Sequence, residues 1–208
     1  MAVMALTTPA SIESRRLLLR IVRREDLAAL MSVNGDPLVT DFLPYETWAS
    51  LADAEAWFER MQTLQSGGTA LQFVIVDKAS QRAIGTCLLF RHEENSQRAE
   101  LGYVLGRAFW RQGVMAEALR ALLSAAFTTM ALRRIEAEVN PANTASTRLL
   151  EAIGFVREGL LRQRWVAKGA PPHDVAVFGC WPRNTNPDRP SQVITSLRSS
   201  EGLTNRDT

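Results

Sequence analysis

The fold is decided by residues 109–118, which read FWRQGVMAEA. They follow a strand-like segment and begin an amphipathic helix, so a short turn that contains Gly113 joins the two elements. Glycine has no Cβ, which lets a ligand lie close to the backbone. The first N–H groups of a helix lack intrahelical partners and carry partial positive charge, and Arg111 adds a cation beside them. The stretch therefore predicts a site for an anionic phosphate group.

The segments on either side predict a mixed α+β domain. Helices are expected at 24–32, 50–65, 114–130 and 144–152, most clearly at 50–65 and 114–130, where apolar residues recur at helical spacing. Strands are expected at 17–21, 71–76, 84–90, 99–105, 134–139, 161–166 and 174–180, and a further strand begins at Phe155. The links between the strands from 71 to 105 are short, which favours antiparallel neighbours and a largely antiparallel sheet.

The length fits one domain, which we expect at residues 13–183. Residues 1–12 are expected to form a loose start. Residues 184–208 are polar, and we expect this tail to be disordered.

The composition is that of an ordinary globular protein, with 46% hydrophobic and 22% charged residues and a formal net charge of +2. This charge gives no support to nucleic-acid binding, and no apolar run reaches the ~20 residues of a membrane helix. Cys87 and Cys180 lie in apolar strand-like runs, so we expect both to be reduced core residues. No ligand spacing typical of a metal site is present, so no metal is expected. The N-terminus lacks a signal-peptide pattern, which favours the cytoplasm.

Two common phosphate loops, GxxxxGK(S/T) and GxGxxG after a strand, are absent. The motifs that are present resemble those of the GCN5-related N-acetyltransferase (GNAT) superfamily, and within it the Rim type, which acetylates ribosomal-protein N-termini. The resemblance covers residues 12–182 and implies a GNAT fold, in which the central strands of the sheet splay apart. It rests on five blocks in the family's order: 13–20, 99–105, 110–113, 140–146 with 150–155, and His173-Asp174.

The resemblance implies acetyl-coenzyme A as the acetyl donor. Its pyrophosphate would lie against the backbone of Arg111, Gln112, Gly113, Val114, Met115 and Ala116. Its pantetheine arm would pair with the strand backbone at Tyr103, Val104 and Leu105, and Asn143 would hold the arm, cap the next helix, or do both.

Met115 departs from the family pattern, which has Gly or Ala at this position. We expect its side chain to enter the core, because it begins the apolar stripe of the helix.

Acetyl transfer to an amine needs a group that accepts the amine's proton, since most amines are protonated at neutral pH. Glu100 is the candidate base by its place on the strand that lines the acetyl group in similar proteins. Its alternative is a solvated glutamate paired with an arginine such as Arg98, and Glu136 and Glu138 on the next strand are weaker rivals.

The family's usual acid is a tyrosine on the helix at 144–152, and this chain has Leu150 in its place. The Rim-type pattern offers Ser146, which would approach the coenzyme A sulfur or, alternatively, only bond to a backbone carbonyl.

The acceptor groove is expected near an aromatic and proline cluster. Phe42 and Tyr45 are its candidate substrate contacts, with Leu43, Pro44 and Trp48 beside them, although ordinary packing between helices explains the cluster equally well. Asp174 would bind the incoming amine or form an ion pair with an arginine, and His173 is more simply structural.

Three functions are compatible with these features. The first is acetylation of a protein N-terminus, the second is acetylation of a small amine such as an amino sugar, an antibiotic or a polyamine, and the third is a silent module that binds acetyl-coenzyme A. The sequence leaves the acceptor open and is compatible with a monomer or a homodimer.

Overall fold

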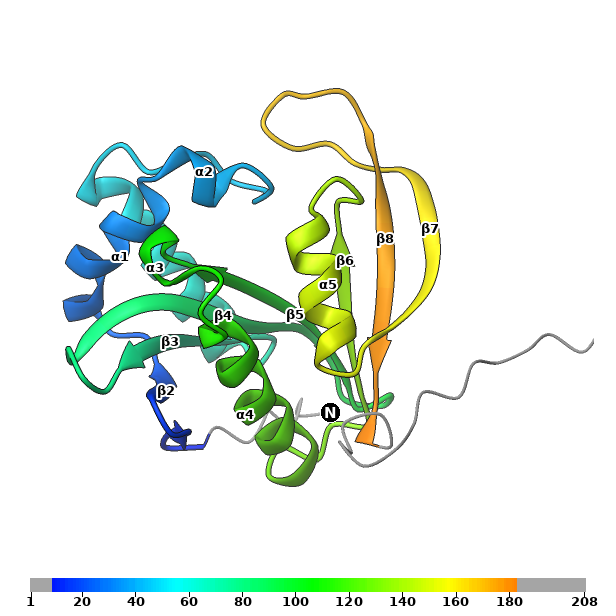
Figure 1. Ribbon diagram of the computed structural model, residues 1–208, viewed down its shortest axis with the longest axis horizontal. Coiled ribbons are helices and arrows are strands. Elements are labelled where there is room, and N and C mark those ends of the chain that lie inside the picture. Colours follow the sequence, from blue (N-terminus) through cyan, green and yellow to red (C-terminus); the bar gives the residue numbers. More distant parts are fainter. Residues whose placement is uncertain (1–8, 183–208) are drawn as a thin grey trace, which may run out of the picture.

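The computed structural model describes residues 9–182 (Figure 1). Its strands are β1 (Ile12–Glu13), β2 (Leu17–Ile21), β3 (Leu71–Asp77), β4 (Arg82–Glu93), β5 (Arg98–Leu105), β6 (Arg134–Val139), β7 (Val156–Trp165) and β8 (His173–Cys180). Its helices are α1 (Leu27–Asn34), α2 (Pro37–Thr40), α3 (Leu51–Ser66), α4 (Val114–Thr128) and α5 (Thr144–Ala152), with short 3-10 turns η1 (Arg24–Asp26) and η2 (Arg107–Phe109). The polar tail expected at 184–208 and most of the expected loose start lie outside the described residues.

The described strands form one sheet in the order β1-β2-β3-β4-β5-β6-β8-β7. Every neighbouring pair is antiparallel except β5 and β6, which run parallel because α4 forms the crossover between them. The expectation of a mixed, largely antiparallel sheet is therefore confirmed.

Helices cover both faces of the sheet. The larger core cluster lies under α4 and α5, where Leu119, Leu122 and Leu150 are fully buried. The second cluster lies under α1 and α3 and includes Leu30 and Phe58. Figure 1 shows α4 and α5 on the near side of the sheet and the fainter α3 behind it. The larger core holds Cys87, and both cysteines are buried and unpaired, as expected.

The central strands separate part-way along their length. The ladder between β5 and β6 has only three partner pairs, Arg98 with Arg134, Ala99 with Ile135 and Glu100 with Glu136. Beyond Glu100 the two strands diverge, as Figure 1 shows, so residues 102–105 of β5 have an open edge toward β6. The splayed sheet implied by the sequence resemblance is present.

Three elements differ from the sequence expectation, and the first is the short strand β1 at Ile12–Glu13, which begins in the expected loose start. Residues 156–165 form one continuous strand, β7, rather than a strand at Phe155 and a second at 161–166. This strand contains irregularities between Arg157 and Gly159 and between Leu161 and Trp165, which disturb the alternation that the sequence pattern relied on. The short helix α2 was also not expected, because four residues are too few to show helical periodicity.

Candidate active site

The turn before α4 has the backbone geometry that its glycine predicts. Gly113 is the N-cap residue and has φ +71°, in the left-handed region that favours glycine. A Cβ built on it would meet only the end of the Arg16 side chain, at 3.9 Å, so the space beside the backbone is open. The first N–H groups of α4 therefore face a site where an anion has room to bind.

Met115 does not enter this space. Its side chain is 7% exposed and belongs to the larger core, together with Val114. The expectation that Met115 faces the core is confirmed, and the departure from the family pattern leaves the turn unobstructed.

The turn is fastened to the start of the domain by contacts that the sequence did not reveal. The guanidinium of Arg16 donates to the carbonyl of Gln112 at 3.2 and 3.3 Å and forms an ion pair with Glu117 at 2.6 Å. Glu117 also accepts bonds from the Arg16 N–H and the Ser14 hydroxyl, each at 2.8 Å. The sequence held one sign of these contacts. Glu117 lies in the first turn of a helix that is expected to bind phosphate, and it would repel a pyrophosphate unless a cation neutralised it.

These contacts control the charge of Glu117. Burial raises the pKa of Glu117, but the bonds from Arg16 and Ser14 and the charge of Arg16 outweigh it and lower the pKa to about 2. The carboxylate is therefore ionised, and the charge of Arg16 neutralises it. The positive end of the α4 dipole thus remains available to a ligand.

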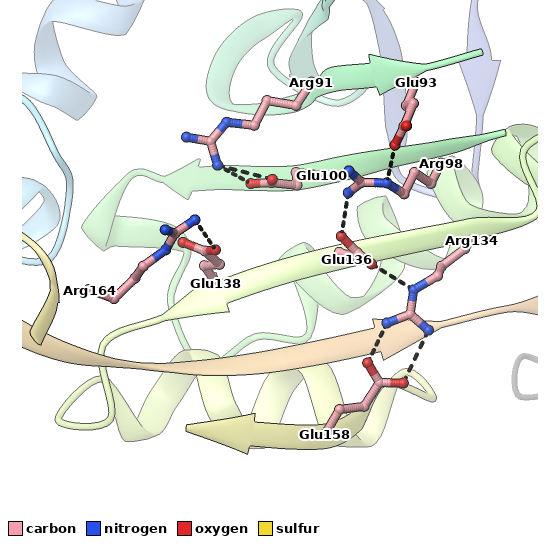
Figure 2. Close-up of polar contacts among 9 residues, drawn as sticks. All are labelled: Arg91, Glu93, Arg98, Glu100, Arg134, Glu136, Glu138, Glu158 and Arg164. Atoms are coloured by element: carbon pink, nitrogen blue, oxygen red, sulfur yellow. Dashed lines mark hydrogen bonds and ion pairs between the residues drawn. The ribbon is translucent and has the colours of Figure 1, made fainter. Parts of the chain in front are cut away.

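Glu100 lies at the point where β5 leaves β6. It is 8% exposed and lies on the face of β5 opposite to Ala99, Leu101 and Tyr103, which pack on the larger core. Both of its carboxylate oxygens accept from Nη1 of Arg91, at 3.0 Å each (Figure 2). The alternative of a glutamate paired with an arginine is thus present in part, with Arg91 in place of Arg98, because Arg98 bonds to Glu93 and Glu136.

The rival glutamates are engaged in other contacts. Glu136 is bound by both Arg98, at 2.8 Å, and Arg134, at 2.7 Å. Burial raises the pKa of Glu136, but these two arginines outweigh it and hold the pKa below its usual range. A carboxylate with two guanidinium partners is a poor proton acceptor.

Glu138 accepts a hydrogen bond from Nε1 of Trp165 at 2.6 Å, and its nearest cation, Arg164, is 3.8 Å away. Figure 2 shows Glu100, Glu136 and Glu138 over the same side of the sheet. Glu100 lies at the last pair before β5 and β6 separate, and Glu138 lies two residues beyond that pair on β6.

The opposite face of β5 carries Tyr103. Its hydroxyl is buried and finds no hydrogen-bond partner within residues 9–182. Burial raises the pKa of Tyr103 to about 12, although the nearby Ser146 hydroxyl acts in the other direction. A buried polar atom without a partner, beside an open strand edge, is consistent with a polar ligand at this place.

Asn143 and Ser146 belong to the first turn of α5, where the side chain of Asn143 caps the helix by accepting from the Ser146 N–H at 3.1 Å. The capping role considered for Asn143 is therefore present. Leu150 is fully buried, so α5 presents no hydroxyl where the family has its tyrosine.

The aromatic residues expected to line the acceptor groove differ in their burial and contacts. Tyr45 donates its hydroxyl to Asn34 at 2.8 Å, and burial raises its pKa. Trp48 is 6% exposed and contacts the Trp57 ring, whereas Phe42 is 41% exposed. Packing thus accounts for Tyr45 and Trp48, and Phe42 alone of the three is exposed.

The loop between β7 and β8 reaches across the open end of the sheet. Lys168 in this loop donates to the carbonyl of Thr40 at the end of α2, a contact that sequence reasoning missed. Asp174 at the start of β8 accepts from the Gln163 N–H at 3.0 Å, and His173 stacks edge-on against Trp165. Asp174 therefore supports the irregular part of β7, and no ion pair of Asp174 is found within residues 9–182.

Two other properties of the described residues bear on the chemistry. No group of three or more His, Cys, Asp or Glu side chains in residues 9–182 is placed to hold a metal ion. In the same part of the chain, no helix is long and apolar enough to cross a membrane.

Proteins named as acetyltransferases are similar to this chain in sequence and in structure. Residues 16–156 match the acetyltransferase (GNAT) domain family. An uncharacterized N-acetyltransferase of Bacillus licheniformis, p20, is 37% identical over 156 residues, which cover 75% of this chain and 88% of the relative.

Two solved structures from Vibrio cholerae share the fold. A putative ribosomal-protein-serine acetyltransferase has a TM-score of 0.74 and 26% identity, and the match covers 86% of this chain and all of that one. Spermidine N-acetyltransferase, solved with CoA and spermine, has a TM-score of 0.72 and 22% identity, and the match covers 83% of this chain and 99% of that one. The sequence match over most of the domain, together with the splayed sheet and the glycine turn, shows that the chain belongs to the acetyltransferase (GNAT) domain family.

Proposed function

We propose that this protein transfers an acetyl group from acetyl-coenzyme A to a primary amine, and that the acceptor is the α-amino group of a protein N-terminus. The observation that carries the proposal is the open edge of β5, which begins at Glu100 and runs toward the turn at Gly113. One strand thus connects a place for an anionic ligand with a buried carboxylate that faces the opposite side of the sheet.

The residues of this edge fit the coenzyme. Backbone N–H groups from Arg111 to Ala116 would hold the pyrophosphate, and the edge at Tyr103, Val104 and Leu105 would pair with the pantetheine arm. Asn143 lies at the N-terminal end of α5, and its side-chain amide would hold the pantetheine arm. Bound there, the coenzyme supplies an acetyl group activated as a thioester.

Glu100 supplies the base. The amine nitrogen forms a bond to the acetyl carbon, the bond from that carbon to sulfur breaks, and the amine's proton passes to Glu100 directly or through one water molecule. The buried position of Glu100 excludes most competing solvent, and Glu100 lies on the face of the sheet opposite to α4 and α5. A backbone N–H on the open edge would stabilise the negative charge that develops on the acetyl oxygen.

The charges around Glu100 bear on the class of acceptor. Glu93, Glu136 and Glu158 each have a close arginine partner, Glu138 has Arg164 at 3.8 Å, and Glu100 has Arg91. A polyamine carries several positive charges and needs several free carboxylates, which this face does not offer among the described residues. A single α-amino group needs only one carboxylate, which would be Glu100 once Arg91 is displaced. The likeness to the putative ribosomal-protein-serine acetyltransferase supports this acceptor.

A small amine is the second candidate, and the likeness in fold to the spermidine enzyme favours testing it. Purified protein should be incubated with acetyl-coenzyme A and peptides that begin with Ala, Ser or Thr, with spermidine and aminoglycosides in parallel. Mass spectrometry should locate the acetyl group on the α-amino nitrogen of the peptides. The matched control is the same peptides with a blocked N-terminus and an internal lysine.

Each outcome separates the candidates. Acetylation of free but not blocked peptides supports the proposal. Acetylation of spermidine or an aminoglycoside alone would replace the acceptor and keep the enzyme. Tight coenzyme binding with no product from any amine would make the protein a binding module.

A further inference from the structure

Tyr103 carries a buried hydroxyl that the fold itself does not use. The hydroxyl makes no hydrogen bond within residues 9–182, although the ring packs against the larger core. Burying a phenol hydroxyl without a partner costs free energy, and native proteins keep few such groups. The other tyrosine, Tyr45, shows the usual arrangement, because its buried hydroxyl bonds to Asn34.

The position of Tyr103 gives this hydroxyl a direction. Tyr103 lies three residues beyond Glu100, where β5 has already left β6, and its side chain is on the face that packs against α4 and α5. Ser146 in the first turn of α5 is near enough to influence the Tyr103 hydroxyl. The hydroxyl therefore lies on the α5 side of β5, near Ser146, where the edge of β5 is open.

This chain also lacks the tyrosine that the family resemblance implies on α5. Leu150 replaces the tyrosine of α5 and is fully buried in the core. Ser146 also brings a hydroxyl that could contact the coenzyme A sulfur, but a serine hydroxyl is a poor proton donor by its chemistry. Tyr103 brings a phenol to the same space from the strand instead of from the helix.

We propose that the Tyr103 hydroxyl donates a hydrogen bond to the sulfur of coenzyme A and stabilises the thiolate that leaves during acetyl transfer. The proposal rests on the proposed function, because it assigns a residue to the same site. When the bond between carbon and sulfur breaks, its electron pair stays on sulfur, and the resulting negative charge accepts the hydrogen bond. The proton remains on Tyr103, and the thiolate takes a proton from solvent as coenzyme A is released.

The order of acidities supports a hydrogen bond without proton transfer. The pKa of Tyr103 is raised to about 12, whereas an ordinary thiol has a pKa of about 8.5. A proton on the phenol therefore stays on oxygen when a thiolate lies beside it. A hydrogen bond to an ionised acceptor is stronger than one between neutral groups, so the effect should be largest for the leaving thiolate.

Binding of coenzyme A and of desulfo-coenzyme A, which lacks the sulfur, tests this without any acceptor. Calorimetry at pH 9, where much of the thiol is ionised, should show coenzyme A binding weakened at least about tenfold by Tyr103→Phe. Binding of desulfo-coenzyme A should be unchanged. The ultraviolet absorbance of the bound thiolate should also show the thiol ionising at higher pH in Tyr103→Phe than in the wild type.

Tyr45→Phe is the matched control, because it removes the other tyrosine hydroxyl and should leave the ratio of the two affinities unchanged. Equal weakening of both ligands by Tyr103→Phe, or no weakening of either, would overturn the proposal. Circular dichroism and thermal unfolding should show an intact fold, since the substitution removes a hydroxyl without a partner.

The result is independent of the acceptor. If the sulfur preference is found but no amine is acetylated, the assignment of Tyr103 stands and the proposed function fails. If amines are acetylated and the preference is absent, only Tyr103 is removed from the mechanism. A wild-type protein that does not bind coenzyme A would overturn both.

Discussion

Arg91 holds the carboxylate of Glu100 with a single nitrogen, which lies 3.0 Å from each carboxylate oxygen. The two side chains differ in exposure, since that of Glu100 is 10% exposed and that of Arg91 is 55% exposed. Arg91 has φ +51° and lies where the register of β4 against β5 shifts between Phe90 and Glu93. This bulge places Arg91 over Glu100, so a half-exposed cation covers the carboxylate that we propose as the base, and in that proposal the acceptor displaces it.

Replacing Arg91 by glutamine should therefore favour the acceptor. Most α-amino groups arrive protonated, and Arg91→Gln removes a competing positive charge beside Glu100. An exposed ion pair is worth about 0.2–1 kcal/mol, so the KM for a peptide acceptor should fall by roughly 1.5- to 5-fold. Steady-state kinetics at low ionic strength would measure this change. The remote exposed pair of Arg24 with Glu55 gives the control Arg24→Gln, and a KM that rises only in Arg91→Gln would contradict the prediction.

Glu100→Gln should slow turnover at neutral pH and leave coenzyme binding intact. The amide has nearly the shape of the carboxylate but cannot accept the amine's proton, and loss of a general base typically costs about 10²–10⁴ in rate. Rates should be compared from pH 6 to pH 9, with coenzyme affinity measured by calorimetry. Glu136→Gln is the matched control, because Glu136 lies opposite Glu100 but is held by two arginines. Rates that do not change in Glu100→Gln across this range would remove Glu100 from the mechanism.

Local patterns predicted the parts of the site that depend on local structure. The helical stripe placed Met115 in the core, and the glycine at the helix start predicted the turn whose residue has φ +71°. The residue types of the Asn143 turn predicted a cap, which the structure contains. Each of these features is set by residues within one or two turns of chain.

The missed features depend on long-range contacts or on irregular backbone. Arg16 and Glu117 are 101 residues apart, and nothing in the sequence pairs them. Arg91 reaches Glu100 because of a bulge in β4. In a regular strand Arg91 would point to the face opposite to that of Phe90, which is the residue paired with Glu100. The sequence suggested Arg98 because it lies two residues from Glu100, but the register of β5 against β6 turns Arg98 toward Glu136.

Gly113→Ala should weaken both the fold and coenzyme binding. The alanine would have to keep φ near +71°, which costs a residue with a Cβ about 1–2 kcal/mol. If the turn relaxes, the N–H groups that would hold the pyrophosphate lose their alignment. Urea unfolding and calorimetry with coenzyme A would measure the two effects. Gly159→Ala on β7 is the control, because a Cβ there meets nothing within 4 Å and the backbone needs no left-handed conformation, so both quantities should stay close to the wild type.

The contacts of Glu117 should make the stability of the fold depend on pH. The pKa of Glu117 is lowered from 4.5 to about 2 in the folded protein, so the folded state binds this proton less readily than the unfolded state. Its contribution to the free energy of unfolding is therefore fully present above about pH 4.5 and is lost as the pH falls toward 2. Urea unfolding of the wild type and of Glu117→Gln at steps from pH 7 to pH 2 would measure it. The difference between the two proteins should shrink through this window. Arg16→Gln should remove only part of the shift, because it deletes the side-chain bond and the charge of Arg16 but keeps the backbone N–H bond and the Ser14 bond to Glu117. A difference that stays constant from pH 7 to pH 2 would show that Glu117 stabilises the turn by packing rather than by its charge.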